Sequence, residues 1–352
     1  MEQLTFVGPH ELEWRDVAAP EIDDPRAALV RPIAVASCDL DSGIVAGSAP
    51  LPGPFAFGHE FVADVVATGA GVTTVGPGTR VVVPFQISCG TCGPCTRGLT
   101  ASCANVPLMA SYGLAPLSRE YGGALSDLVK VPFADAMLVP LPDRVDPVAA
   151  AGVSDNIPDG WRAVAPGLER EPGAPVLVIG GAGSGSVGLY AAAVAVALGS
   201  TQVDYVDTDP ARLRVAELVG AHAHEATTKR RYGSYPITVN HAPEPAGLLA
   251  ALRSTAPGGT CTSTTIYFGA DVALPMLEMY TTGVTLTTAR VSARAAIPTV
   301  LDLIAGGRLH PELVTANVVA WPDAAEALAH HTHKTVGVRP GIEPPASTTT
   351  LR

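Results

Sequence analysis

The apolar positions of the first 150 residues form short runs that Gly- and Pro-rich turns separate. The clearest of these β-type runs are Leu29–Val35, Phe61–Ala67, Arg80–Pro84 and Leu125–Val131. Turn signals such as GAGVTTVGPGTR lie between them. Short apolar runs with frequent turns are typical of antiparallel strands. This part of the chain is therefore expected to be mostly antiparallel or barrel-like β structure.

The pattern changes near residue 155. The segment APVLVIGGAGSGSVGLYAAAVAVALGS combines an apolar strand, a glycine-rich turn and an Ala-rich helix, and QVDYVDTDPARLRVAELVGA adds a second strand and helix. This alternation predicts a parallel, doubly wound sheet. It fades near Thr288, after which Ala295–Gly306 is typical of an amphipathic helix and Val336–Arg339 of a strand. The C-terminal residues 343–352 are expected to be disordered.

Length and composition limit the class of protein. A chain of 352 residues with 47% hydrophobic and 16% charged residues favours two folded domains over a disordered protein. The net charge of −11 argues against nucleic acid or an anionic membrane as a partner. The N-terminus lacks a signal-peptide pattern, and the longest apolar stretch, Val187–Leu198, is too short to span a bilayer. A cytoplasmic location is therefore expected.

Four cysteines lie close together in the run CGTCGPCTRGLTASC: Cys89, Cys92, Cys95 and Cys103. Four thiolates at this spacing can surround one tetrahedral Zn²⁺ ion. A pair of disulfides is the alternative, although disulfide scaffolds are usually short and rich in cysteine. Because four thiolates leave no open coordination position, the pattern predicts a structural metal site, with the chemistry elsewhere in the chain.

A dinucleotide-binding turn follows the predicted strand Val176–Ile179. The glycines Gly183, Gly185 and Gly188 have the spacing G-x-G-x-x-G, between a strand and a helix whose N-terminus can bind phosphate. The residues expected to approach the cofactor phosphates are Gly181, Gly183, Gly185, Ser186, Val187 and Gly188.

Cofactor preference depends on the residues after the next strand. Asp207 ends that strand, where a carboxylate can bind the ribose hydroxyls and favour NAD(H) over NADP(H). Arg212 lies near enough to receive a phosphate, which weakens this preference. The alternative is a Rossmann-type domain whose nucleotide site is empty or binds something else.

A second group of metal-ligand residue types, Cys38 and His59-Glu60, lies far from the four cysteines. Taken singly, such residues are more often part of a core than ligands. Taken with Asp41, the four cysteines and the glycine-rich turn, they complete a recognisable pattern. Over nearly its full length the chain resembles the zinc-dependent alcohol dehydrogenases of the medium-chain dehydrogenase/reductase superfamily.

The resemblance implies a GroES-like catalytic domain, a Rossmann domain and two zinc ions per chain, one catalytic and one structural. It implies that Cys38, His59 and Asp155 bind the catalytic zinc, that Glu60 approaches it, and that Asp41 orients the histidine. The four cysteines would hold the structural zinc. The implied reaction is hydride transfer between NAD(H) and a small-molecule alcohol or carbonyl substrate.

Further implications concern the pocket and the boundaries. Phe85 would line the substrate pocket, and Lys334 would face the cofactor phosphates. The expected catalytic domain spans residues 1–155 and the NAD-binding domain residues 156–288, with residues 289–352 returning to the catalytic domain. The family suggests a homodimer or homotetramer.

Three positions depart from the family pattern. Leu40 stands where most members have the Ser or Thr that begins a proton relay, Asp159 replaces the usual Thr beside the nicotinamide, and Asp39 stands where many members have Gly or Arg. Asp39, Ser42 and Asp159 are candidates for moving the proton. Two alternatives follow: a reductase of activated C=C or C=N bonds, and a non-catalytic NAD(H)-binding protein that holds only the structural zinc.

Overall fold

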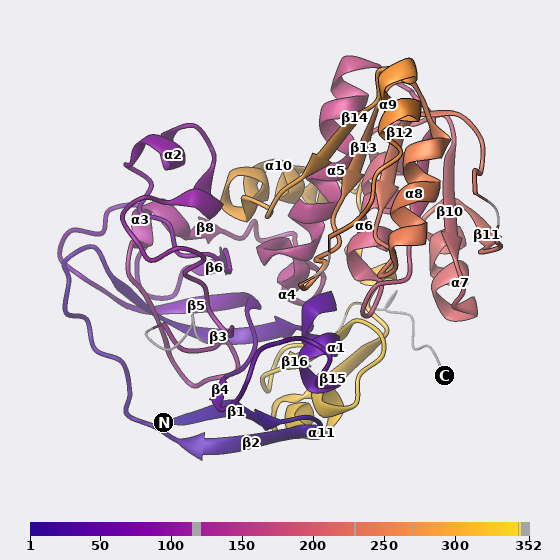
Figure 1. Ribbon diagram of the computed structural model, residues 1–352. Coiled ribbons are helices and arrows are strands. Elements are labelled where there is room, and N and C mark those ends of the chain that lie inside the picture. Colours follow the sequence, from indigo (N-terminus) through magenta and orange to yellow (C-terminus); the bar gives the residue numbers. More distant parts are fainter. Residues whose placement is uncertain (115–120, 229, 270, 344, 346–352) are drawn as a thin grey trace.

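The structure is a computed structural model that describes residues 1–114, 121–228, 230–269, 271–343 and 345. Figure 1 shows a β-rich N-terminal half beside a half in which helices cover a sheet. The yellow C-terminal segment returns to the N-terminal half. Most of the C-terminal tail, for which disorder is expected, lies outside the described residues.

The glycine-rich turn belongs to a six-stranded parallel sheet with the strand order β11-β10-β9-β12-β13-β14. Its strands are β9 (Val176–Ile179), β10 (Val203–Asp207), β11 (His222–Glu225), β12 (Tyr235–Asn240), β13 (Thr255–Ser263) and β14 (Thr285–Thr288). This order is that of the Rossmann fold, whose strand order reverses between the first and fourth strands and leaves a crevice there for a ligand. The expected doubly wound sheet is confirmed.

The alternation of side chains along β9 explains how helices cover both faces. Val176 and Val178 pack with residues of the helices before and after the strand, while Leu177 and Ile179 pack with residues of the helix that follows β12. Because successive strand residues point to opposite faces, one continuous apolar run serves both layers. The helices are α5 (Asn156–Arg170), α6 (Ser186–Ala197), α7 (Pro210–Leu218), α8 (Pro245–Ser254) and α9 (Met276–Thr282).

The N-terminal half contains a seven-stranded sheet and a small three-stranded one within the described residues. The larger sheet has the order β15-β16-β3-β5-β6-β8, with β7 paired to β3, and the smaller has the order β2-β1-β4. The strands are β1 (Glu2–Gly8), β2 (Glu11–Asp16), β3 (Ala28–Ala36), β4 (Phe55–Ala56), β5 (Glu60–Thr68), β6 (Arg80–Val83), β7 (Val129–Val131), β8 (Val139–Pro140), β15 (Asn317–Ala320) and β16 (Thr335–Val338). Except for the parallel pair β15–β16, the pairs in these two sheets are antiparallel, as expected.

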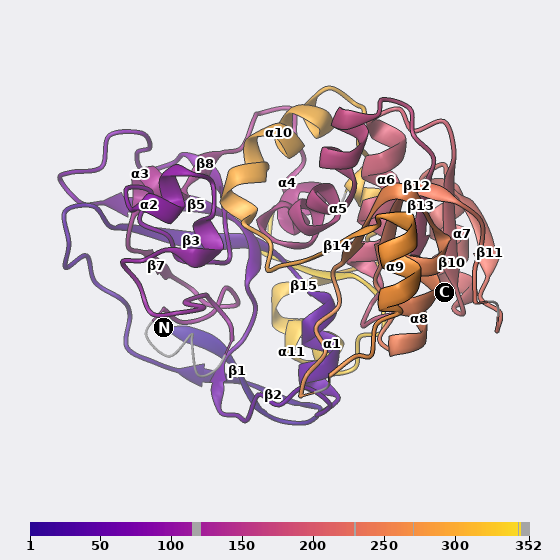
Figure 2. The same cartoon turned by 45° about the horizontal axis from the view of Figure 1, so that its top comes forward.

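The C-terminal segment joins the two halves. Helix α10 (Ala293–Ala305) contacts both α5 and the cysteine lobe, which we define as residues 89–103 (Figure 2). The remaining short helices are α1 (Asp39–Val45), α2 (Gly93–Thr96), α3 (Ala134–Met137), α4 (Pro147–Ala150) and α11 (Ala324–Ala329). Among the described residues, no helix has both the length and the apolar character to cross a membrane.

Candidate active site

Cys38, His59 and Asp155 converge between the two halves. One ligand atom from each lies within 4.8 Å of the others, and all three side chains are buried. The Cys38 thiol lies 3.3 Å from Asp155 Oδ2, and His59 Nε2 lies 3.5 Å from the same oxygen. A sulfur, an imidazole nitrogen and a carboxylate oxygen are a donor set that suits Zn²⁺ and leaves a fourth position open. The residues present therefore fit a catalytic zinc ion.

Each of the three residues stands at the end of an element. Cys38 precedes α1, His59 precedes β5, and Asp155 precedes α5. Side chains at element ends can point into the space between domains without breaking a hydrogen-bond ladder. The backbone thus brings together residues that are up to 117 positions apart in the sequence.

Asp41 lies behind the histidine, as the resemblance implies. Its Oδ1 is 3.6 Å from His59 Nδ1, and both atoms are buried without a hydrogen-bond partner. Its other oxygen accepts the Cys38 amide at 2.9 Å. A carboxylate beside the second ring nitrogen favours the tautomer in which Nε2 faces the metal position. Asp41 therefore binds the Cys38 backbone and faces the second ring nitrogen of His59.

Glu60 and Lys334, which the sequence analysis treats separately, pair with each other in the folded chain. The Lys334 ammonium donates to Glu60 Oε2 and, at 3.0 Å, to Asn156 Oδ1, in fully buried surroundings. Glu60 Oε1 accepts the Asn156 amide at 3.1 Å. Each of these buried charges needs its partner because burial removes solvation. Glu60 is therefore not among the three residues that converge on the metal position. Its approach to the metal and the place of Lys334 at the cofactor phosphates stay predictions.

Asn156 is a functional candidate that the sequence analysis missed. Its Nδ2 donates to the Cys38 sulfur at 3.2 Å and to Asp155 Oδ2 at 3.3 Å. Its Oδ1 accepts from Lys334 and, at 2.8 Å, from the Ser186 hydroxyl at the start of α6. One amide therefore links two metal-binding residues to the nucleotide helix. The only sequence signal is its position directly after Asp155.

Charges around the site shift its acid-base groups. Burial raises the pKa of the Cys38 thiol, and the charge of Asp155 raises it further. Burial lowers the pKa of His59, but the charge of Asp41 and the contact with Asp155 outweigh it and raise the pKa to about 9. A cation at this position would be stabilised by the same carboxylates, which is the electrostatic setting that a metal ion requires.

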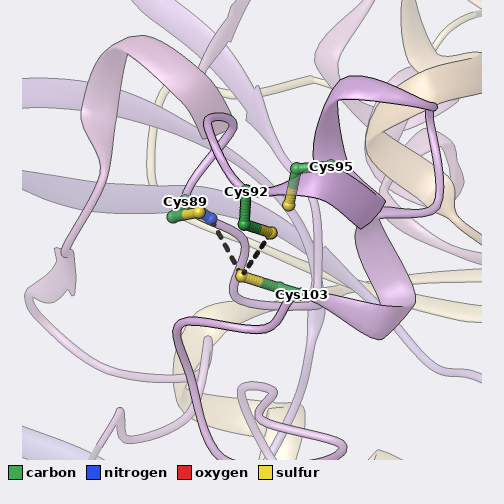
Figure 3. Close-up of side chains that lie close together, drawn as sticks. All are labelled: Cys89, Cys92, Cys95 and Cys103. Atoms are coloured by element: carbon green, nitrogen blue, oxygen red, sulfur yellow. Dashed lines mark hydrogen bonds between the residues drawn. The ribbon is translucent and has the colours of Figure 1, made fainter.

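The four cysteines of the cysteine lobe form a second group of this kind, with one ligand atom from each within 4.8 Å of the others. Figure 3 shows their side chains directed toward a common centre. The Cys92 sulfur lies 3.9 Å from that of Cys103, which also accepts the Cys89 amide at 3.4 Å. All four are free thiols, so the structure contains no disulfide here. The lobe fits a structural zinc ion.

Two cavities lie beside the metal-binding group and the glycine-rich turn. The first, of about 640 Å³, is lined by Gly180, Gly181, Asp207 and Thr208 at the carboxyl ends of β9 and β10. The second, of about 820 Å³, is lined by the three metal-binding residues. Both include Pro243, so they adjoin at the point where the strand order reverses. Their arrangement fits the two ends of a dinucleotide.

The turn itself needs its glycines. Gly183 and Gly185 have φ values of 54° and 78°, in the left-handed region that glycine adopts at low cost. A Cβ on Gly183 would lie 2.3 Å from the Asp39 carbonyl, and one on Gly185 would lie 2.2 Å from Arg212 Cδ. The loop is thus pressed against neighbours from both halves of the molecule.

Asp39 occupies the N-terminus of α6, where the cofactor phosphates are expected. Its carboxylate accepts from the amides of Ser186 and Val187 at 2.9 and 2.8 Å. It also accepts from the hydroxyls of Ser184 and Ser186 at 2.5 and 2.8 Å, and from His241 Nε2 at 2.8 Å. A carboxylate on first-turn amides mimics a bound phosphate. The glycine-rich turn thus has the form of a dinucleotide-binding turn. In this structure, however, the Asp39 carboxylate occupies the position of a cofactor phosphate.

His241 is a second residue that the sequence analysis missed. It follows β12, and its Nδ1 lies 2.9 Å from the Thr264 hydroxyl while Nε2 faces Asp39. Burial alone would raise the pKa of Asp39, but the hydrogen bond and charge of His241 and the bonds from Ser184 and Val187 lower it. Asp39 is therefore ionised in this setting. The sequence signal that could have identified His241 is its position as a polar residue at the carboxyl end of a strand beside the crevice.

The carboxylate of Asp207 is held by partners within the protein. It ends β10 and lines the first cavity, but it is only 1% exposed. Arg212 donates to both of its oxygens at 2.8 Å, and Tyr205 and the following amides donate as well. Its acceptor positions are therefore largely used within the protein. Arg212 in turn is held by this ion pair rather than open to a 2′-phosphate.

The second cavity contains the residues that depart from the family pattern. Leu40, Phe85 and Asp159 line it, and the Phe85 ring lies 5.6 Å from the His59 ring. Burial raises the pKa of Asp159 to about 6, with Arg162 opposing the shift and Asp155 adding to it. Ser42 also lines this cavity, and its hydroxyl lies 3.1 Å from His331 Nε2. Asp159 is therefore a titratable group near neutral pH on the cavity wall.

Comparison with known families and proteins gives consistent matches. Residues 24–143 match the alcohol dehydrogenase GroES-like domain. A glutathione-independent formaldehyde dehydrogenase of Pseudomonas aeruginosa is 33% identical over 231 residues, which are 62% of this chain and 56% of that protein. This chain thus spans little more than half of that relative's length.

Other relatives match over larger shares of their length. A medium chain reductase/dehydrogenase of Acremonium sp is 32% identical over 226 residues, which are 63% of this chain and 74% of that protein. Among solved structures, the alcohol dehydrogenase from Thermus sp. ATN1 is 28% identical with a TM-score of 0.88, covering 96% of this chain and 100% of that one. The expected combination of a GroES-like domain with a Rossmann domain is confirmed.

Proposed function

Because this chain belongs to the zinc-dependent alcohol dehydrogenases of the medium-chain dehydrogenase/reductase family, we propose that it is an oxidoreductase that transfers a hydride between NAD(H) and an alcohol/carbonyl pair. The observation that carries the proposal is the convergence of Cys38, His59 and Asp155 on a cavity that adjoins the glycine-rich turn. A Zn²⁺ ion held by these residues would act as a Lewis acid toward the substrate oxygen.

The protein's own residues supply position, exclusion of water and proton movement. Phe85 and Leu40 give the cavity wall an apolar surface beside the metal-binding group. The Leu40 side chain has no group that can accept or donate a proton, so another residue must receive the proton of the substrate hydroxyl. Asp159, with its pKa of about 6, is the candidate for this role because it lines the same cavity and titrates close to neutral pH.

The proposal is tested by metal analysis together with turnover. The purified protein is expected to hold two zinc ions and to produce the near-ultraviolet absorbance of reduced nicotinamide from NAD⁺ and at least one alcohol. Cys38→Ala should abolish turnover and leave one zinc. Cys261→Ala is the matched control, since Cys261 is a buried thiol of β13 outside both metal-binding groups. Equal zinc content in the two variants would contradict the proposal.

A second candidate function is the reduction of activated C=C or C=N bonds. The specific observation in its favour is that Leu40, rather than a hydroxyl-bearing residue, lines the cavity beside Cys38. Turnover of enones or imines with NADH, together with no turnover of any alcohol or aldehyde, would favour it. A protein that holds one zinc, in the cysteine lobe only, would instead favour a non-catalytic nucleotide-binding role.

A further inference from the structure

The cavity beside the metal-binding group contains a cation that forms no ion pair with a described carboxylate. Arg290, shortly after β14, is half-buried and lines this cavity. Its Nη1 donates to the Ala101 carbonyl at 3.3 Å, and within the described ranges no carboxylate lies within ion-pair distance of its guanidinium. Burial lowers the pKa of Arg290, and the charge of Asp155 opposes this shift without reversing it.

Each of the other charged residues that line the cavity has a partner of its own. Asp39 pairs with His241 at 2.8 Å, and Asp159 pairs with Arg162 at 2.5 Å. Asp155 belongs to the metal-binding group, where a divalent cation would balance its charge and that of the Cys38 thiolate. With the metal bound, Arg290 is left without a charged partner at ion-pair distance. A half-buried charge without a partner is unfavourable, and an incoming anion would remove that cost.

A second unpaired donor lies on the same cavity wall. Ser111 lines the cavity, is 0% exposed, and its hydroxyl has no hydrogen-bond partner. Ser111 pairs with Gln86 through a β-bridge, and Gln86 Nε2 donates to the carbonyl of Val291, the residue after Arg290. This chain of contacts ties the Ser111 segment to the Arg290 segment. Buried hydroxyls normally have partners, so a missing one points to a ligand.

We propose that the substrate carries an anionic group, a carboxylate or a phosphate, which Arg290 and Ser111 bind while the reacting hydroxyl faces the metal-binding group. This inference rests on the proposed function and names the substrate class. A guanidinium suits it because it can donate two parallel hydrogen bonds to either anion. In the reaction, the hydroxyl carbon gives a hydride to NAD⁺, and the hydroxyl gives its proton to Asp159, which passes it to solvent. The anionic group is unchanged.

The experiment compares substrates that differ in one charged group. The pairs are lactate with 1,2-propanediol, which tests a carboxylate, and glycerol 3-phosphate with glycerol, which tests a phosphate. For the zinc-loaded enzyme with NAD⁺, kcat/KM is expected to be about 100-fold higher for the anionic member of at least one pair. Arg290→Gln should remove that preference and change kcat/KM for the neutral alcohol less than about threefold.

Arg294→Gln is the matched control. Arg294 is also half-buried and donates to a backbone carbonyl, that of Ala136, but it does not line the cavity. Calorimetric titration of lactate and of glycerol 3-phosphate into the zinc-loaded, NADH-bound protein supplies a readout independent of turnover. Wild type and Arg294→Gln are expected to bind at least one of these anions, and Arg290→Gln to bind neither.

The outcomes separate this inference from the proposed function. Equal use of anionic and neutral alcohols, or an unchanged preference in Arg290→Gln, would overturn the anionic substrate and leave the dehydrogenase function standing. A weaker affinity of Arg290→Gln for NADH, with the anion preference intact, would assign Arg290 to the cofactor and also overturn it. Anion binding that depends on Arg290, without oxidation of any alcohol, would support the subsite and contradict the dehydrogenase function.

Discussion

The carboxylate of Asp39 is expected to weaken the binding of a dinucleotide. It holds the two first-turn amides of α6, those of Ser186 and Val187, together with two hydroxyls and His241. These amides are the donors that a pyrophosphate requires at a glycine-rich turn. The cofactor must therefore either displace Asp39 or bind its phosphates beside a negative charge. Replacing Asp39 by Asn or Ser removes that charge.

The size of the effect follows from Coulomb's law. A carboxylate and a phosphate charge about 5 Å apart repel each other by about 3 kcal/mol at an effective dielectric constant of about 20. Some of this repulsion is relieved when the Asp39 side chain turns toward solvent. We therefore expect removal of the charge to tighten NADH binding by about 2 kcal/mol, which is roughly a 30-fold decrease in Kd.

Fluorescence or calorimetric titration of NADH measures this change directly. Asp209→Asn is the matched control, because it removes a nearby carboxylate that caps α7 at the Ala211 and Arg212 amides instead of contacting α6. Its Kd for NADH should change less than about threefold. The reasoning is refuted if Asp39→Asn and Asp39→Ser, folded and zinc-loaded, bind NADH no more tightly than wild type.

Three further predictions concern the pH profile, the buried ion pair and the cysteine lobe. Asp159 can accept a proton only when ionised, so kcat/KM should fall as the pH drops below its pKa of about 6, and Asp159→Asn should lose that limb. Lys334→Met leaves Glu60 buried without a charged partner and should cost about 3–5 kcal/mol in urea unfolding, against less than about 1 kcal/mol for Lys130→Met, whose partner Asp23 is exposed. Cys103→Ser should reduce zinc from two ions to one and lower the Tm by about 5 °C or more, and an unchanged Tm would argue against a structural metal.

Local patterns were sufficient for strands such as β3, β5, β6 and β9, for the glycine-rich turn and for the cysteine lobe. A continuous apolar run places β9, and the Ala-rich segment after the turn places α6. The spacing of four cysteines within 15 residues brings their sulfurs together without help from the rest of the fold. Such features depend on neighbours in the chain, so the sequence displays them directly. The grouping of Cys38, His59 and Asp155 could be anticipated only through the family resemblance.

The partners of buried charges could not be anticipated in this way. Lys334 and Glu60 are 274 positions apart, and no local pattern around either residue indicates that they pair. Asn156 has no motif of its own, because its importance comes from lying among three elements that meet only in the folded chain.

The amino-acid sequence alone therefore determined which elements form and which donor atoms are available, because these depend on short-range spacing and side-chain chemistry. The tertiary structure alone decided which charge neutralises which: Lys334 binds Glu60, Arg212 binds Asp207, and Asp39 takes the phosphate position on α6. Burial removes water as a partner, so each charged group binds the nearest complementary group that packing supplies, and packing is a property of the whole fold.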